Sequence, residues 1–349
     1  MKRLLRKTAA AFAAAVFLIT GIQAAPSVSA VSAFLLDADS GRVLYEKNAD
    51  EPRLIASTTK IMTGLLVCEN MDPEQEVTVP DGAVGVEGSS LYLKKGERVT
   101  VRELLYGLML QSGNDAAAAL AILLDGSEEA FAERMNRRAE ELELREMHFR
   151  NPNGLDAEGH FASARCLGLL TAEAMRNPLF RQVVSTKTIT VGSRSFANHN
   201  KLLWQYSGAV GVKTGYTKAA GRTLVSCAER DGRRLIAVTL CDPDDWRDHA
   251  ALLDYGFSAF TKTQIIQQGQ ELCRISVAGG KEDFVPVCAG GAFSYPLLPD
   301  EKPELRLKAP QLLFAPVLHG QAGTAEIWLH GQKIGEVSAY FKNPVPKDG

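Results

Sequence analysis

The order in which strand and helix patterns follow one another constrains the fold most strongly. Two short apolar strands flank an Asp-Ser-Gly turn within 33–56, which is typical of a β-hairpin. The strand pattern returns after Val184, where Asp231-Gly232 forms a two-residue turn between alternating runs. A helix is expected at 246–260. The segment between these strands has mostly helical patterns. The sequence therefore predicts a first domain in which strands, helices, strands and a final helix follow one another.

The helices of the middle segment can be placed from the spacing of their apolar residues. Four apolar side chains recur at helical spacing after a Ser and two Thr, and they predict a buried helix over 57–69. The same spacing predicts further helices at 101–110, 114–124 and 128–144.

The pattern changes again past about Thr263, where short strands are broken by Gly, Pro and Asp turns and no helical period remains. This change predicts a small all-β C-terminal domain. The expected division is a signal peptide at 1–30, a first domain at 31–262, an all-β domain at 263–343 and a polar tail at 344–349.

The first thirty residues have the character of an export signal. A basic start, MKRLLRK, is followed by a predominantly apolar run of 14 residues at 9–22 and then by small residues, with cleavage expected after Ala30 or Ala25. An uncleaved anchor would need about 20 apolar residues, and no later segment is long enough to span a bilayer. The mature protein is therefore expected outside the cytoplasm, in the cell wall or periplasmic space. The chain stops at Pro-Lys-Asp-Gly without an amphipathic helix, so we expect it to be soluble or only peripherally attached.

The net charge and the placement of cysteines and histidines argue against a nucleic-acid partner, a disulfide framework and a metal site. The formal net charge is −2, and a nucleic-acid partner is not expected. The six cysteines are scattered singly among aliphatic residues, which favours buried thiols over a disulfide framework. No histidine or cysteine spacing suits a metal site, and nothing in the sequence predicts a cofactor.

Three short patterns carry the chemistry: Ser57-Thr58-Thr59-Lys60, Ser112-Gly113-Asn114 and Lys213-Thr214-Gly215. Residues i and i+3 share one face of a helix, so Lys60 is expected beside the Ser57 hydroxyl. A lysine can accept a proton from that hydroxyl only when it is neutral, and burial with a second cation lowers a lysine pKa toward that state. Lys213 is the natural second cation.

The three patterns differ in how specific they are. Ser-x-x-Lys and Ser-x-Asn are each expected about once by chance in a chain of this length, whereas Lys-Thr-Gly is expected on the order of 0.1 times. Taken singly, the first two are better explained as a helix cap and a turn. Their occurrence once each, in this order, on a helix start, a helix junction and a strand favours a shared site.

With their surroundings, these residues resemble a known family. IASTTKIMT, LMLQSGNDAA, NPNGLD followed by His160, NHNKLLW and GVKTGYTKAAGRTLVS are similar to the D-alanyl-D-alanine carboxypeptidases, the low-molecular-mass penicillin-binding proteins. The resemblance covers roughly 33–260. It implies an α/β (α+β) domain of the serine β-lactamase and transpeptidase type at 31–262, with an antiparallel sheet flanked by helices and an all-β C-terminal domain beside it.

The resemblance also implies roles for individual residues. Ser57 would be the nucleophile, Lys60 its general base, and Ser112 the proton relay to the leaving amine. The substrate-binding residues would be Asn114, Lys213, Thr214, Gly215 and Tyr216, with the backbone amides of Ser57 and Tyr216 as the oxyanion hole. The partners implied are a peptidoglycan stem peptide ending in D-Ala-D-Ala and β-lactams as inhibitors. Arg222 and Arg247 both remain candidates for contacting the substrate carboxylate.

Two alternative functions share these patterns. A class A-like β-lactamase would add a deacylating glutamate, and Glu173 with Asn177 superficially offers Glu-x-x-x-Asn. This pattern follows the Ser163 helix cap, which favours an ordinary helix surface instead. The predicted all-β C-terminal domain is also not expected in a compact β-lactamase. A non-catalytic β-lactam or peptidoglycan sensor would not need an intact serine and lysine pair.

Overall fold

The computed structural model describes residues 24–349. Residues 1–23, which hold most of the predicted signal peptide, lie outside the described part. Val28 and Ala30 are buried, and the Ser29 hydroxyl donates to Asp248 Oδ2 at 2.8 Å and to Asp242 Oδ1 at 3.1 Å. The segment 28–30 is therefore packed against the first domain.

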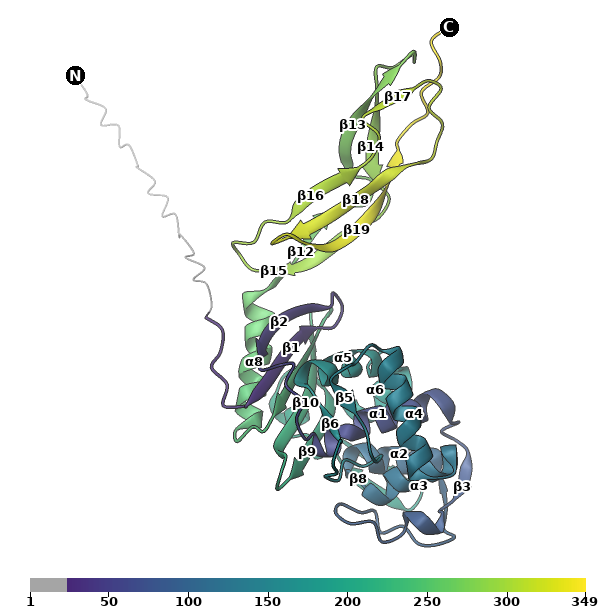
Figure 1. Cartoon of the computed structure of the whole chain (residues 1–349), viewed down its shortest axis with the longest axis vertical. Helices are drawn as coiled ribbons and strands as arrows, with labels where there is room; N and C mark the ends of the chain where they lie inside the picture. The colour runs from purple at the N-terminus through teal and green to yellow at the C-terminus, as the bar shows by residue number, and fades with distance from the viewer. Residues whose placement is uncertain (1–23) are drawn as a thin grey trace, which may run out of the picture.

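A five-stranded antiparallel sheet forms the centre of the first domain, in the order β2, β1, β11, β10, β9 (Figure 1). These strands are β1 (Ser32–Asp37), β2 (Arg42–Lys47), β9 (Ala209–Thr217), β10 (Gly221–Arg230) and β11 (Arg233–Leu240). The sheet joins the N-terminal hairpin to the strands predicted after Val184, so the chain closes around its helical middle.

Strand β1 shows why the sheet is covered on both sides. Phe34 and Leu36 belong to the hydrophobic core under the helical region, whereas Ala33 and Leu35 belong to a second core. That second core packs against α8 (Asp245–Ala259). Since neighbouring side chains of a strand point to opposite faces, a continuous apolar run fits a sheet with helices on both faces.

Seven helices make up the middle of the described chain. They are α1 (Lys60–Asn70), α2 (Val101–Leu110), α3 (Asn114–Asp125), α4 (Glu128–Glu141), α5 (Ala164–Ala174), α6 (Pro178–Ser185) and α7 (Leu202–Gln205). The Thr100 side chain caps α2 by accepting from the Glu103 amide at 3.1 Å, and Gly126 ends α3 with φ 85°. These ends agree closely with the predicted helices at 101–110 and 114–124.

Two-stranded antiparallel sheets and 3-10 turns lie between the helices. The sheets pair β3 (Glu76–Thr78) with β4 (Arg98–Thr100), β5 (Met147–His148) with β6 (Phe161–Ala162), and β7 (Thr188–Val191) with β8 (Arg194–Ala197). The 3-10 turns are η1 (Ala56–Thr59) and η2 (Asp81–Ala83). The sequence predicted one helix from Ser57, but α1 begins at Lys60 because Ile55 O accepts from the Thr58 amide and hydroxyl, which tightens the preceding turn.

The C-terminal part of the described chain is all β, as the sequence predicts. A six-stranded sheet has the order β16, β18, β19, β14, β13, β17, and a separate pair joins β12 to β15. Their bounds are β12 (Thr261–Ile266), β13 (Glu271–Ala278), β14 (Phe284–Ala289), β15 (Phe293–Leu297), β16 (Glu304–Lys308), β17 (Leu312–Phe314), β18 (Gln321–Leu329) and β19 (Gln332–Phe341). The proposed domain limits remain predictions; within 344–349, Val345 is buried and pairs with Val317.

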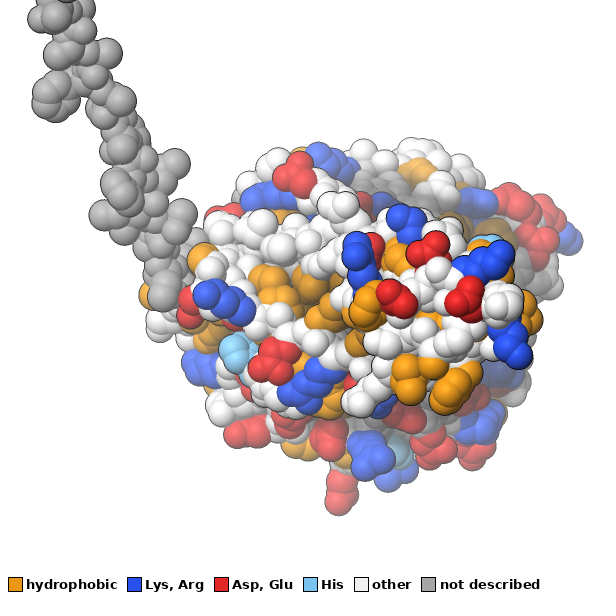
Figure 2. All heavy atoms as spheres, turned by 90° about the horizontal axis from the view of Figure 1, so that it is seen from above, with side chains coloured by type: hydrophobic (Ala, Val, Ile, Leu, Met, Phe, Trp, Pro, Cys, Tyr) orange, Lys and Arg blue, Asp and Glu red, His pale blue; other side chains and the backbone are white. Residues whose placement is uncertain are grey.

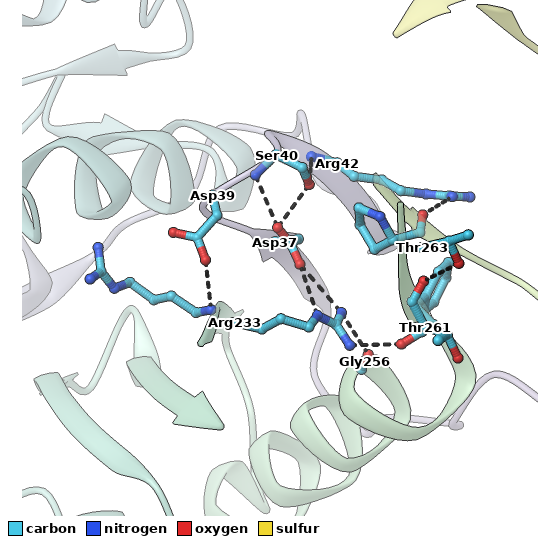
Figure 3. A network of polar contacts seen from close by, with 11 residues as sticks. Asp37, Asp39, Ser40, Arg42, Arg233, Gly256, Thr261 and Thr263 are labelled. Atoms are coloured by element: carbon cyan, nitrogen blue, oxygen red, sulfur yellow. Dashed lines mark hydrogen bonds and ion pairs between the residues drawn. The ribbon is translucent and has the colours of Figure 1, made fainter. Parts of the chain in front are cut away.

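Polar contacts tie the end of α8, and the C-terminal part at Glu301, to the central sheet (Figure 3). The Arg233 guanidinium contacts Asp37 Oδ2 at 3.3 Å and donates to Phe260 O at 2.7 Å. Arg42 forms a bidentate pair with Glu301 and lies over the Phe260 and Tyr295 rings, 4.9 and 5.3 Å from their centroids. The junction is therefore held by the buried Arg233–Asp37 pair and the half-buried Arg42–Glu301 pair as well as by apolar packing.

The surface carries charges of both signs. From above, with the all-β part nearest the viewer, basic and acidic side chains alternate with scattered hydrophobic ones (Figure 2). Over residues 24–349 no helix is long and apolar enough to cross a membrane. All six cysteines are free thiols: Cys166 and Cys227 are buried, Cys241 is exposed, and the other three are half-buried. The prediction that most of the cysteines are buried is therefore wrong, since only Cys166 and Cys227 are.

Candidate active site

The three patterns converge on one pocket of about 360 Å³ beside strand β9. Ser57 enters it from η1, Ser112 from the junction of α2 and α3, and Thr214, Gly215 and Tyr216 from β9. The remaining lining residues are Ser89, His199, Lys201, Arg222, Asp245 and Trp246. Segments more than 150 residues apart in sequence thus form a single concave site.

Lys60, the first residue of α1, is fully buried behind the Ser57 side chain and does not line the pocket itself. Its Nζ is 3.0 Å from Ser57 Oγ, 2.7 Å from Asn114 Oδ1 and 2.6 Å from Asn153 O. The two carbonyl oxygens can only accept, so the amine donates to both of them. A neutral amine then has one lone pair left, and the Ser57 hydroxyl is the contact that can supply it with a proton.

Burial, and next the positive charge of Lys213, lower the pKa of Lys60 well below its usual value. The Asp115 carboxylate opposes this shift. Lys213 itself is 1% exposed on β9, its Nζ donates to Thr214 O at 2.8 Å, and burial lowers its pKa to about 7. The electrostatics of the site thus favour a neutral lysine next to the serine.

Gly215 allows β9 to approach the nucleophile closely. A Cβ at this position would lie 2.4 Å from Thr223 Oγ1 and 2.9 Å from the Ser57 amide nitrogen. The Thr223 hydroxyl in turn donates to Ile55 O at 3.2 Å, which ties the strand to the turn that carries Ser57. The strand and the turn therefore meet backbone to backbone, with no room for a side chain.

Asn114 and its neighbour Asp115 hold the loop that contributes Ser89 to the pocket. Asn114 Oδ1 accepts from Lys60, and its Nδ2 donates to Glu87 O at 2.6 Å. The buried Asp115 carboxylate accepts from the Ser90 hydroxyl at 2.7 Å and from the Leu91 amide at 2.9 Å. These bonds fix the loop that presents Ser89 to the pocket. Ser112 is buried and has φ 60°, a left-handed conformation that turns the chain between the two helices.

Of the two arginine candidates, the structure brings Arg222 to the pocket. Arg222 Nη2 donates to both oxygens of the buried Asp245 at 2.7 and 2.8 Å, and its guanidinium lies 5.7 Å from the Trp246 ring centroid. Arg247 is exposed and pairs with Asp244 at 3.2 Å. Glu173, considered for a β-lactamase, lies on α5 and pairs with Arg176 at 3.1 Å, away from the residues that line the pocket.

Several lining residues were not predicted as site residues. His199 and Lys201 occur in NHNKLLW, which contributed only to the resemblance, and Ser89 and Asp245 carry no local pattern. Burial, and then the charge of Lys213, lower the pKa of His199, so this ring shares the electrostatics of the lysines. In the described residues, no cluster of His, Cys, Asp and Glu is arranged to hold a metal ion.

Comparison with known proteins decides the family. The profile of the D-alanyl-D-alanine carboxypeptidases matches residues 20–244, and that of the C-terminal domain of penicillin-binding protein 5 matches residues 260–347. The chain belongs to the D-alanyl-D-alanine carboxypeptidase family. It is therefore a hydrolase of the serine carboxypeptidase type, and the predicted family, fold class and enzyme class are confirmed.

Individual relatives match over most of their length. The D-alanyl-D-alanine carboxypeptidase DacF of Bacillus subtilis is 32% identical over 92% of this chain and 87% of its own. DacC of Escherichia coli is 36% identical over 89% of this chain and 82% of its own.

Solved structures show the same architecture. Penicillin-binding protein 5 of Haemophilus influenzae superposes with a TM-score of 0.77 at 27% identity, covering 93% of this chain and all of the other (100%). Penicillin-binding protein 6B of Escherichia coli gives 0.73 at 31% identity, covering 91% and 97%. These matches support the carboxypeptidase function and do not favour the β-lactamase or sensor alternatives.

Proposed function

We propose that this enzyme removes the terminal D-alanine from peptidoglycan stem pentapeptides through an acyl-enzyme on Ser57. The observation that carries the proposal is the buried Lys60 Nζ, 3.0 Å from Ser57 Oγ, with its pKa lowered by burial and by Lys213. Neutral Lys60 takes the hydroxyl proton as Oγ attacks the carbonyl carbon of the D-Ala-D-Ala peptide bond. The amide C–N bond then breaks and D-alanine leaves.

The other site residues take supporting roles in the proposal. Ser112, on the pocket wall, passes a proton to the leaving amine. The amides of Ser57 and Tyr216 stabilise the developing oxyanion, which the close approach of Gly215 to the Ser57 amide supports. Lys213 and Thr214 bind the terminal carboxylate. Water then attacks the Ser57 ester, releasing the shortened peptide and restoring the serine hydroxyl.

The proposal also covers inhibition by β-lactams and the compartment in which the enzyme acts. A β-lactam opens on Ser57 to give an ester that hydrolyses slowly, so β-lactams act as inhibitors. Peptidoglycan lies outside the cytoplasmic membrane, and the basic and apolar start of the chain supports export to that compartment.

The test is release of D-alanine from a diacetyl-L-lysyl-D-alanyl-D-alanine tripeptide, measured beside turnover of a chromogenic cephalosporin. We expect catalytic D-alanine release and at most slow cephalosporin turnover. Rapid cephalosporin turnover without D-alanine release would instead establish the β-lactamase alternative. A protein with neither activity would support the alternative of a non-catalytic sensor.

A further inference from the structure

A buried histidine lies behind the turn that carries Ser57. His160 is 2% exposed, directly precedes β6 and packs edge-on against the Phe149 ring. The Arg150 amide donates to its Nδ1 at 3.1 Å. A backbone amide can only donate, so Nδ1 is the acceptor and the neutral ring carries its proton on Nε2.

This tautomer fixes the direction of the next two hydrogen bonds. His160 Nε2 donates to Thr59 Oγ1 at 2.8 Å, and the Thr59 hydroxyl donates to Ala56 O, also at 2.8 Å. Thr59 is fully buried. A continuous chain of hydrogen bonds therefore runs from the Arg150 amide through His160 and Thr59 to the carbonyl of the residue before the nucleophile.

The carbonyl at the end of this chain belongs to an unusual backbone position. Ala56 has φ 46°, in the left-handed region that residues with a Cβ rarely occupy. Gly154 also lies against this carbonyl, and a Cβ there would be 2.0 Å from Ala56 O and 2.9 Å from Thr59 Oγ1. Such a conformation persists only where its surroundings hold it, and here the Thr59 hydroxyl and the Gly154 backbone do so.

The same loop also holds the general base. Asn153 O accepts from Lys60 Nζ at 2.6 Å, next to Gly154 in sequence. Burial, followed by the charge of His148, lowers the pKa of His160 to about 4, so the ring is neutral at neutral pH. A neutral ring keeps Nδ1 free to accept from Arg150, as the chain of hydrogen bonds requires.

We propose that His160 is a positioning residue for acyl transfer: through Thr59 it holds the left-handed turn at Ala56 that aims the Ser57 hydroxyl and amide. The inference rests on the proposed function. It places His160 outside substrate contact, so its loss affects the chemical step and leaves peptide binding nearly intact.

The test compares acylation with non-covalent binding in the full-length enzyme. His160→Phe keeps an aromatic ring without its polar atoms, and we expect it to lower the second-order rate of labelling by a fluorescent penicillin by about tenfold or more. In a Ser57→Ala background, the same change should leave the Kd of a D-Ala-D-Ala tripeptide within about twofold. His160→Gln, which can still donate to Thr59, should recover much of the rate.

The chain offers a matched control and a coupled partner. Thr171 is equally buried, and its hydroxyl donates to Leu167 O at 2.6 Å within α5, so Thr171→Val removes a comparable bond without touching Ala56 or the loop that holds Lys60. We expect Thr171→Val to keep the wild-type labelling rate. Thr59→Val should lose as much as His160→Phe, Thr59→Ser should not, and the Thr59→Val/His160→Phe double variant should be no slower than the slower single one.

The proposal is overturned if His160→Phe labels at the wild-type rate, if peptide affinity falls as far as labelling, or if Thr171→Val loses as much. Additive effects of the Thr59 and His160 changes would also overturn it. If His160→Phe does not fold, the Thr59→Val and Thr59→Ser pair decides the question alone. A wild-type enzyme without D-alanine release or labelling would instead refute the proposed function, which is a separate result.

Discussion

Lys60 Nζ lies 3.0 Å from Ser57 Oγ, three residues and one 3-10 turn away, and burial together with the charge of Lys213 lowers the pKa of this base. A 3-10 turn has about three residues per turn, so it stacks residues i and i+3 more directly than an α-helix does. The tight turn therefore sets the distance between nucleophile and base.

The first prediction concerns the pH dependence of acylation. The pKa of Lys60 is lowered, so its neutral form appears at a lower pH than for an ordinary lysine, and acylation should rise with pH through that lowered value. Lys213→Ala removes the second cation, which raises the pKa of Lys60 and moves the rising limb to higher pH. Labelling rates across a pH series test this shift, and an unmoved limb would contradict the coupling.

Lys213 should control the opposite limb. Burial lowers its pKa to about 7 in the free enzyme, and a neutral Lys213 binds a carboxylate poorly. A bound carboxylate favours the charged lysine and raises its pKa. The falling limb of kcat should therefore lie at higher pH than that of kcat/KM for a D-Ala-D-Ala peptide. Coincident falling limbs would argue against carboxylate binding by Lys213.

Gly215→Ala should damage catalysis more than stability. The new Cβ would meet Thr223 Oγ1 at 2.4 Å and the Ser57 amide at 2.9 Å, displacing the predicted oxyanion donor. Loss of one such donor costs about 10²–10³ in rate. Gly291, whose added Cβ meets nothing within 4 Å, provides the control. Equal labelling rates for the two alanine variants would rule out this close approach as a requirement.

The junction beside α8 should matter for stability and little for chemistry. Arg42 and Glu301 form a half-buried bidentate pair, and Glu301→Gln leaves the Arg42 charge without its partner. An exposed ion pair is worth about 0–1 kcal/mol and breaking a fully buried one costs about 3–5 kcal/mol, so the cost for this half-buried pair should lie between these limits. We expect a lower Tm and an unchanged rate of labelling by a soluble penicillin. A large loss of labelling in the folded variant would show that the all-β part contributes to the active site.

Acid should weaken the same junction. Burial alone would raise the pKa of Glu301, but hydrogen bonds from Arg42, the Leu298 amide and His330 hold it below its usual value. A lowered carboxyl pKa contributes stability above the unfolded pKa of about 4.3, and this contribution is lost as pH falls through the folded value. The Tm difference between wild type and Glu301→Gln should therefore shrink in acid, as thermal unfolding across pH can show.

The sequence predicted the parts of the site that local patterns encode. Helical spacing predicted the bounds of α2. The three short patterns and their order along the chain predicted that Ser57, Lys60 and Lys213 belong to one site. The loop that presents Ser89 has no local signature, because it is held by the buried Asp115 carboxylate. The choice between Arg222 and Arg247 likewise depends on the tertiary placement of Asp245 at the pocket wall.

The most direct test of the account is the site of covalent attachment. After incubation with benzylpenicillin, peptide mass mapping should place one acyl adduct on Ser57, and Ser57→Ala should lose both the adduct and D-alanine release while remaining folded. An adduct on another residue, or labelling retained in Ser57→Ala, would contradict the assignment of Ser57 as the nucleophile.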